Sequence, residues 1–145
     1  ATGTGRNVTL AAADNADSIG VFAGCSYVDA TGSPVFSRYS PTGTTATDIV
    51  AHVYDDPKIV YSAEATTIAE ADVQQLADIN GTAGSASTGI SGSSIDGTSY
   101  AATGGAFRVL GLTREPGNAY GAYAKVEVIF AENVLNGVVS GVGGN

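Results

Sequence analysis

The chain has 145 residues, a net charge of −8, one histidine, one cysteine and 20 glycines. This length fits a single domain. The six Lys and Arg residues are scattered singly, which argues against nucleic-acid binding, because such binding needs clustered positive charge. No apolar run approaches the roughly 18 residues that a membrane-spanning helix requires. The low charged fraction of 14% and the abundance of small residues favour a β-rich protein with many turns.

The first half of the chain has the pattern of short strands separated by polar turns. We expect strands at residues 6–11, 18–28, 34–39, 48–54 and 58–65, the second of them bent at Gly20 and Gly24. Residues 29–33 have the composition of a hairpin loop, and residues 55–57 (Asp-Asp-Pro) that of a turn.

One segment has helical spacing. Its apolar stripe consists of Ala69, Val73, Leu76 and Ala77. Thr67 is a suitable N-cap, Glu70 completes a capping box three residues later, and the Asn-Gly pair at 80–81 is a stop signal. We therefore predict one short α-helix near residues 68–79.

The second half contains a Gly/Ser-rich stretch at residues 81–105, with weak strand candidates at 90–95 and 98–102. It is followed by the two strongest strand patterns, at 107–113 and 125–131. Their period of two places Phe107 and Val109 on one face of the first strand, opposite Arg108, Leu110 and Leu112.

The sum of these elements predicts a mainly β fold: an antiparallel β-sandwich or barrel, jelly-roll-like, with one short α-helix near 68–79. Residues 1–134 would form this single β-rich domain. Residues 135–145 contain four Gly and three Val without periodicity, so we expect an extended C-terminal arm. Residues 1–5 are equally featureless, and we expect them to be a second free arm.

The sequence is poor in groups that carry chemistry. His52 has no second ligand at metal-binding spacing, so a structural role is favoured. Asp55 and Asp56 are interpreted as turn residues, with a weak cation site or acid–base chemistry as lesser alternatives. Cys25 fits a small buried hydrophobe. Because no nucleophile-elbow or phosphate-loop motif is present, we expect no enzymatic activity, no cofactor and no metal.

The link at residues 114–123, between the two strongest strands, is too long for a tight hairpin. It contains Arg114, Tyr120 and Tyr123, which are residue types enriched at protein interfaces. We predict that this link is an interaction surface. The apolar residues of the C-terminal arm, Leu135, Val138 and Val139, are further interface candidates.

Several stretches occur together and in order along the chain. They are GVFAG (20–24), AHVYDDP (51–57), QLAD (75–78), FRVLGL (107–112), EPGNAYG (115–121) and AKVEV (124–128). In this combination the chain resembles the head decoration (capsid cement) proteins of tailed bacteriophages, from Ile19 to Asn133. Members of that family usually carry a further N-terminal segment before the position of Ala1, so we expect that this sequence lacks it.

The resemblance implies a non-enzymatic virion protein on the outer capsid surface, assembled in the host cytoplasm, that binds the shell after its expansion and stabilises it. Its implied partners are the major capsid protein of a tailed phage and further copies of itself, as a dimer or trimer. It implies no nucleic-acid or membrane partner. The alternative is a carbohydrate-binding or adhesin-like β-sandwich module of a tail or secreted protein, whose tyrosines would stack on sugars; the lack of Trp weakens it.

Overall fold

The computed structural model describes residues 2–4, 7–9, 18–40, 45–46, 48–85 and 87–132. Short antiparallel strands dominate these residues, which confirms the mainly β fold. In chain order the elements are β1 (Thr2–Thr4), β2 (Asn7–Thr9), β3 (Val21–Val28), β4 (Pro34–Ser37), β5 (Val50–Tyr54), β6 (Tyr61–Glu64), β7 (Thr67–Ile68), the 3-10 turn η1 (Glu70–Asp72), β8 (Leu76–Ala77), β9 (Ile79–Asn80), β10 (Ser94–Ile95), β11 (Phe107–Leu112), β12 (Gly121–Ala122) and β13 (Lys125–Phe130).

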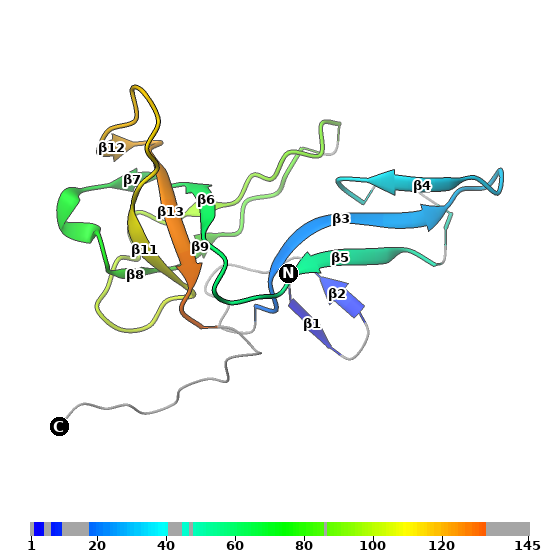
Figure 1. Cartoon of the computed structure of the whole chain (residues 1–145), viewed down its shortest axis with the longest axis horizontal. Helices are drawn as coiled ribbons and strands as arrows, with labels where there is room; N and C mark the ends of the chain where they lie inside the picture. Colours follow the sequence, from blue (N-terminus) through cyan, green and yellow to red (C-terminus); the bar gives the residue numbers. More distant parts are fainter. Residues whose placement is uncertain are drawn as a thin grey trace.

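The strands gather into a core body and an arm (Figure 1). The core body is built on a four-stranded sheet in the order β6-β13-β11-β8, with the pairs β12-β7 and β10-β9 beside it. The arm is a three-stranded sheet in the order β4-β3-β5 that extends to one side of the core body. Strand β1 pairs with β2, so the expected free arm at residues 1–5 is wrong for Thr2–Thr4. The C-terminal arm expected at 135–145 lies outside the described residues.

The pairing of β11 with β13 confirms the two strands predicted from their alternating pattern. Their inward side chains are buried: Phe107, Val109, Val126, Val128 and Phe130. A β-bulge shifts the register after Val109. Leu112, expected on the face opposite Val109, is therefore paired with Val126 and packs against the core.

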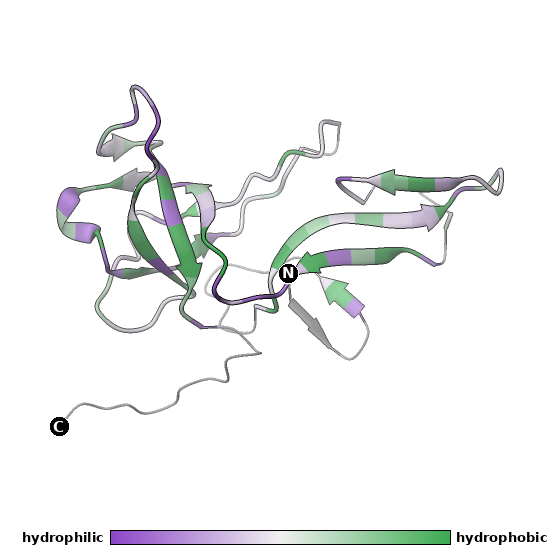
Figure 2. Cartoon of the chain, viewed as in Figure 1, coloured by the Kyte–Doolittle hydropathy of each residue, from purple (hydrophilic) through white to green (hydrophobic). Residues whose placement is uncertain are grey.

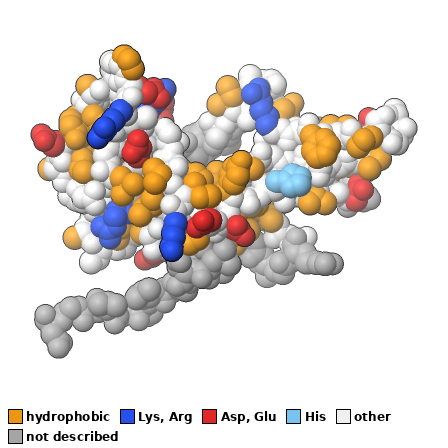
Figure 3. Space-filling model, viewed as in Figure 1, with side chains coloured by type: hydrophobic (Ala, Val, Ile, Leu, Met, Phe, Trp, Pro, Cys, Tyr) orange, Lys and Arg blue, Asp and Glu red, His pale blue; other side chains and the backbone are white. Residues whose placement is uncertain are grey.

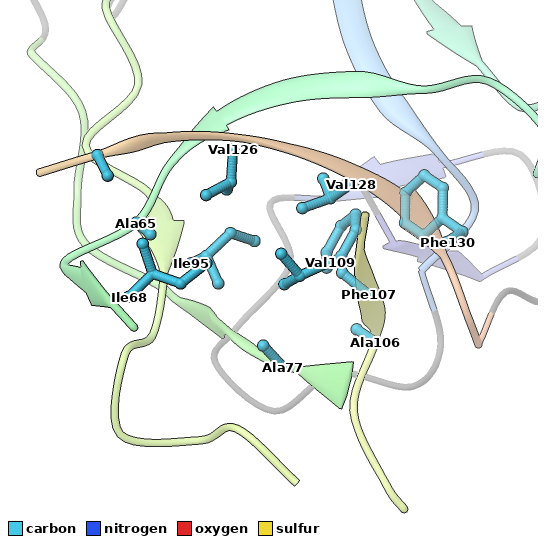
Figure 4. Packing of buried hydrophobic residues seen from close by; sticks show 11 residues of the cluster. Ala65, Ile68, Ala77, Ile95, Ala106, Phe107, Val109, Val126, Val128 and Phe130 are labelled. Atoms are coloured by element: carbon cyan, nitrogen blue, oxygen red, sulfur yellow. The ribbon is translucent and has the colours of Figure 1, made fainter. Parts of the chain in front are cut away.

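The other side of this core comes from short elements far away in the sequence (Figure 4). Ile68 of β7 and Ile95 of β10 are buried and lie across from the valines of β13. The rings of Phe107 and Phe130 pack with their centroids 4.6 Å apart. The core body is thus a small, sandwich-like arrangement of one sheet and a second, incomplete layer.

A strap at residues 95–101 ties together the two edges of the four-stranded sheet. At one end the Thr66 N–H donates to the Ile95 carbonyl oxygen at 3.0 Å. At the other end Leu76 and Ala101 exchange two backbone hydrogen bonds of 2.8 and 2.9 Å. Near this second end, the Tyr100 hydroxyl donates to the Thr67 carbonyl oxygen at 2.9 Å and joins the strap to β7. These bonds pair backbone groups that would otherwise be left at open sheet edges.

The α-helix predicted at residues 68–79 is wrong. The chain forms one 3-10 turn, in which the Asp72 carboxylate accepts the Ala69 N–H at 2.8 Å, and then leaves helical geometry. Gln74 has a φ of +72°, which no α-helix accommodates. Thr67, the expected cap, belongs to β7 instead.

Tertiary pairing explains why the helix does not form. The Gln74 N–H donates to the Val109 carbonyl oxygen at 2.8 Å, and the Val109 N–H donates to the Gln75 carbonyl oxygen at 3.0 Å. The segment therefore supplies the edge strand that β11 lacks on its second side. Leu76 and Ala77 of the predicted stripe are buried, but as part of β8.

In the arm, β3 is the central strand and is distorted at the predicted bend. The register with β5 shifts between Phe22 and Gly24. Gly24 has a φ of +136°, and a Cβ there would lie 2.8 Å from the Ser37 carbonyl oxygen, so only glycine fits. The turn at residues 55–57 joins β5 of the arm to β6 of the core body, so it connects the two sheets.

Replacing Phe107 with Ala should lower the free energy of unfolding by about 3–5 kcal/mol, because a buried ring that packs on Phe130 is lost. Ile90→Ala is the control: Ile90 is 64% exposed and should change stability by less than about 0.5 kcal/mol. Urea unfolding of both variants measures the difference. Equal losses would contradict the placement of the core.

The hydroxyl group of Tyr100 in the strap allows a test at high pH. Burial, with smaller contributions from the charges of Asp72 and Asp96, raises the pKa of the Tyr100 hydroxyl to about 12 from its usual value of 10.0. The folded state holds the hydroxyl proton of Tyr100 more tightly than the unfolded chain does. The stability that the protonated Tyr100 gives the fold is therefore complete below about pH 10 and is lost as the pH rises toward 12. Urea unfolding across this range should show a smaller alkaline loss in Tyr100→Phe than in the parent. Tyr120→Phe is the control, and an unchanged loss in Tyr100→Phe would refute the assignment.

Candidate interaction surface

The loop between β11 and β13 is held closed at its base by one side chain, Asn118. Its Nδ2 donates to the carbonyl oxygens of Thr113 at 2.8 Å and of Lys125 at 2.7 Å. Its Oδ1 accepts the Lys125 N–H at 3.0 Å. Three of the four hydrogen-bonding positions of the amide are therefore used. This arrangement, the Asn118 clamp, fixes the two strand ends relative to each other.

The far part of the loop is attached to the core body by backbone hydrogen bonds. Strand β12 pairs with β7. The Tyr123 N–H donates to the Thr66 carbonyl oxygen at 3.2 Å, and the Ala65 N–H donates to the Ala124 carbonyl oxygen at 2.8 Å. The loop is therefore anchored at its base by Asn118 and along its return by β7. Such a loop loses little conformational entropy when it binds a partner.

The anchored loop displays the three candidate residues that the sequence predicted for it. Tyr120 is 44% exposed, Tyr123 is 73% exposed, and Arg114 is also exposed. Tyr123 has a φ of +56°, an uncommon conformation for a residue other than glycine, and such strain persists where the surrounding bonds impose it. We call Arg114, Tyr120 and Tyr123 the tyrosine loop surface.

Of the charged side chains in and beside this surface, Glu115 and Lys125 are paired with each other, whereas Arg114 has no ion pair among the described residues. Glu115 forms an ion pair with Lys125, with 2.6 Å between Nζ and Oε2. Within the described ranges no second ion pair occurs, so the Arg114 guanidinium is available to a partner. An exposed arginine beside tyrosines is a common composition of an interface centre.

A second exposed surface was not predicted from the sequence. On one side of the arm, alternate residues of all three strands point outward: Val28, Pro34, Phe36, Val50, His52 and Tyr54. We call this set the arm face. Figure 2 shows hydrophobic residues on the arm strands as well as in the core body. In Figure 3, hydrophobic side chains gather around the single histidine, His52. The alternation was visible in the sequence, but it does not reveal which faces a second layer covers.

The other candidate groups have structural roles. The His52 Nε2 lies 3.1 Å from the Ser26 Oγ on the arm face. Cys25 is buried, as predicted, and its Sγ donates to the Tyr39 carbonyl oxygen at 3.4 Å. The Asp56 carboxylate accepts the Lys58 N–H at 2.9 Å, which confirms its interpretation as a turn residue.

Two further carboxylates stabilise loops. Asp29 accepts hydrogen bonds from the Thr31 hydroxyl at 2.6 Å and the Ser33 N–H at 2.9 Å, and these bonds lower its pKa. Asp96 accepts the N–H of Thr98 at 2.9 Å and its hydroxyl at 2.8 Å, which lowers its pKa in the same way. Both carboxylates close local turns of the Asx type.

The candidates in the C-terminal arm, Leu135, Val138 and Val139, lie outside the described residues. In the described part of the chain, no group of three or more His, Cys, Asp or Glu could hold a metal ion. No helix among the described residues has the length and apolar character needed to cross a membrane. Comparison of the chain with protein-family models, with curated proteins and with solved structures finds no match.

The Asn118 clamp can be tested by substitution. Asn118→Ala should lower the free energy of unfolding by about 1–3 kcal/mol, because three hydrogen bonds to the two strand ends are lost together. Glu115→Ala, which removes only the exposed ion pair to Lys125, should cost less than about 1 kcal/mol. Urea unfolding compares the two, and an Asn118 variant as stable as the Glu115 variant would show that the clamp is not needed.

Proposed function

We propose that this chain is a structural virion protein that binds the outer surface of a tailed-phage capsid and stabilises the expanded shell. The observation that carries the proposal is the tyrosine loop surface, a rigid, exposed, aromatic loop held by Asn118 and β7. The stretches FRVLGL, EPGNAYG and AKVEV, which support the resemblance to head decoration proteins, build β11, this loop and β13. The resemblance and the geometry therefore concern the same part of the chain.

The physical properties of the loop suit seating on a preformed shell. Tyr120 and Tyr123 offer apolar area with a polar tip, and Arg114 offers a cation that forms bidentate hydrogen bonds with carboxylates. Many copies on a symmetric shell reinforce one another, so each contact needs only modest strength. The net charge of −8 keeps the protein away from nucleic acid.

The proposed partners are the major capsid protein of a tailed phage and further copies of the chain. The proposed location is the outer capsid surface of a virion that is assembled in the host cytoplasm. The proposed role is structural and non-enzymatic. Leu135, Val138 and Val139 remain proposed contacts of the C-terminal arm with a neighbouring molecule.

One observation favours the alternative of a carbohydrate-binding module. Tyr123 is 73% exposed and could stack on a sugar ring. The two functions differ in what the isolated protein binds. A glycan-binding module would bind immobilised oligosaccharides in the absence of shells, whereas a decoration protein would bind expanded shells even when free oligosaccharides are present in excess.

The double substitution Tyr120→Ala/Tyr123→Ala should weaken binding to expanded, DNA-free shells of the phage that encodes the chain by about 10- to 100-fold, because two interface aromatics are truncated. Co-sedimentation of the variant with shells over a range of concentrations measures the loss. Ile90→Ala, which truncates a side chain that is 64% exposed elsewhere, is the control and should bind normally.

Urea unfolding must show that the double variant keeps its stability, since both tyrosines are exposed. Full binding by the double variant would mean that the loop is ordinary surface. Loss of binding to immobilised glycans, with shell binding retained, would replace the proposal by the carbohydrate-binding alternative.

A further inference from the structure

We infer that the arm face is a self-association surface, on which the arm face of a second copy of this chain packs about a two-fold axis. This inference rests on the part of the proposed function that names further copies of the chain as partners, and it assigns that contact to a surface other than the tyrosine loop, which can be tested without shells. It follows from the shape, the charge and the exposed area of the arm face.

The shape of the arm face is self-complementary. Ser26 on the central strand β3 is paired with both Phe36 on β4 and Val50 on β5, so a small residue lies between two large exposed ones. Beside it, over Gly24, a shallow depression of about 260 Å³ lies between Phe36 and His52. The depression is open toward solvent, and Gly24 at its base has no side chain to fill it. The protruding Phe36 of one copy can therefore enter the depression of the other, and the reverse, as a two-fold contact requires.

The charge of the arm face favours a second copy as the occupant. Two chains with a net charge of −8 repel each other wherever carboxylates face one another. The six residues of the arm face include no carboxylate, lysine or arginine. Two of the six carry a polar group: His52, which already has the Ser26 hydroxyl as a partner, and Tyr54. Arg38, which lines the depression, donates to the Thr88 carbonyl oxygen at 3.1 Å. Close approach of two copies therefore buries no carboxylate, and Arg38 keeps its carbonyl partner.

The exposed area is sufficient for a weak dimer. Phe36 is 81% exposed, Val50 and Tyr54 are each 56% exposed, and Val28 is 43% exposed. With Pro34 and His52 these side chains offer roughly 500 Å² per copy, or about 1,000 Å² in the dimer, the lower limit for a specific interface. Such an area corresponds to reversible association at micromolar or higher concentrations. Two sheets packed in this way would lie about 10 Å apart.

Sedimentation equilibrium of the full chain tests the inference. We expect a monomer–dimer equilibrium between about 10 µM and 1 mM. Phe36→Glu would place a carboxylate from each copy in the contact and should weaken association by more than about 100-fold. Phe36→Leu should keep it. Ala102→Glu is the control, because it adds the same charge at an exposed site of the core body and should leave the dimer intact.

Cross-linking gives an independent test of the geometry. Phe36→Cys should be linked efficiently by a bis-maleimide of about 10 Å span, and Ala102→Cys should not. The native Cys25 is buried and should not react. A chain that stays monomeric to about 1 mM, a dimer that persists in Phe36→Glu, or preferential cross-linking at Ala102→Cys would each overturn the inference.

Discussion

The antiparallel pairing of β11 with β13 is the interaction on which the rest of the structure depends. It buries Phe107 and Val109 against Val126, Val128 and Phe130. It also gives each edge strand of the sheet a partner, because β8 pairs with β11 and β6 pairs with β13. Strand β6 pairs with one side of this unit and β8 with the other, and the strap at residues 95–101 ties those two edges together. The loop that emerges from the unit is anchored at its base because Asn118 joins the ends of the same two strands.

The core body buries only part of the chain's large apolar side chains, and several others remain exposed on the arm. The arm is one three-stranded sheet, and the outward side chains of β4 and β5, Phe36, Val50 and Tyr54 among them, face solvent. The tyrosine loop surface and the arm face lie at opposite ends of the described structure (Figure 1). A molecule with two separate adhesive surfaces can contact a shell with one and another copy with the other, which is the arrangement that the two proposals together describe.

The parts of the fold that follow from local pattern were predictable. The alternation in FRVLGL and KVEVIF identified β11 and β13, and the exposed character of Tyr120 and Tyr123 followed from their position in a long polar link. The helix was mispredicted because the spacing of Ala69, Val73, Leu76 and Ala77 suits a helix, whereas the open edge of β11 draws Gln74 and Gln75 into backbone pairing. The arm face was missed because alternation defines two faces of a strand without showing which one remains uncovered. Whether the segment pairs with β11 instead of forming a helix depends on long-range strand pairing. Which face of the arm stays exposed depends on whether a second layer covers it. Neither can be read from a short window of sequence.

The tyrosine loop is anchored and exposed in the free chain, and we propose that it becomes the contact with the shell. Amide hydrogen exchange of the chain, free and bound to expanded shells, tests it most directly. We expect slower exchange on binding at residues 114–122, whereas the already bonded amides of the strap at 95–101 should change little. Binding that leaves exchange at residues 114–122 unchanged would contradict it.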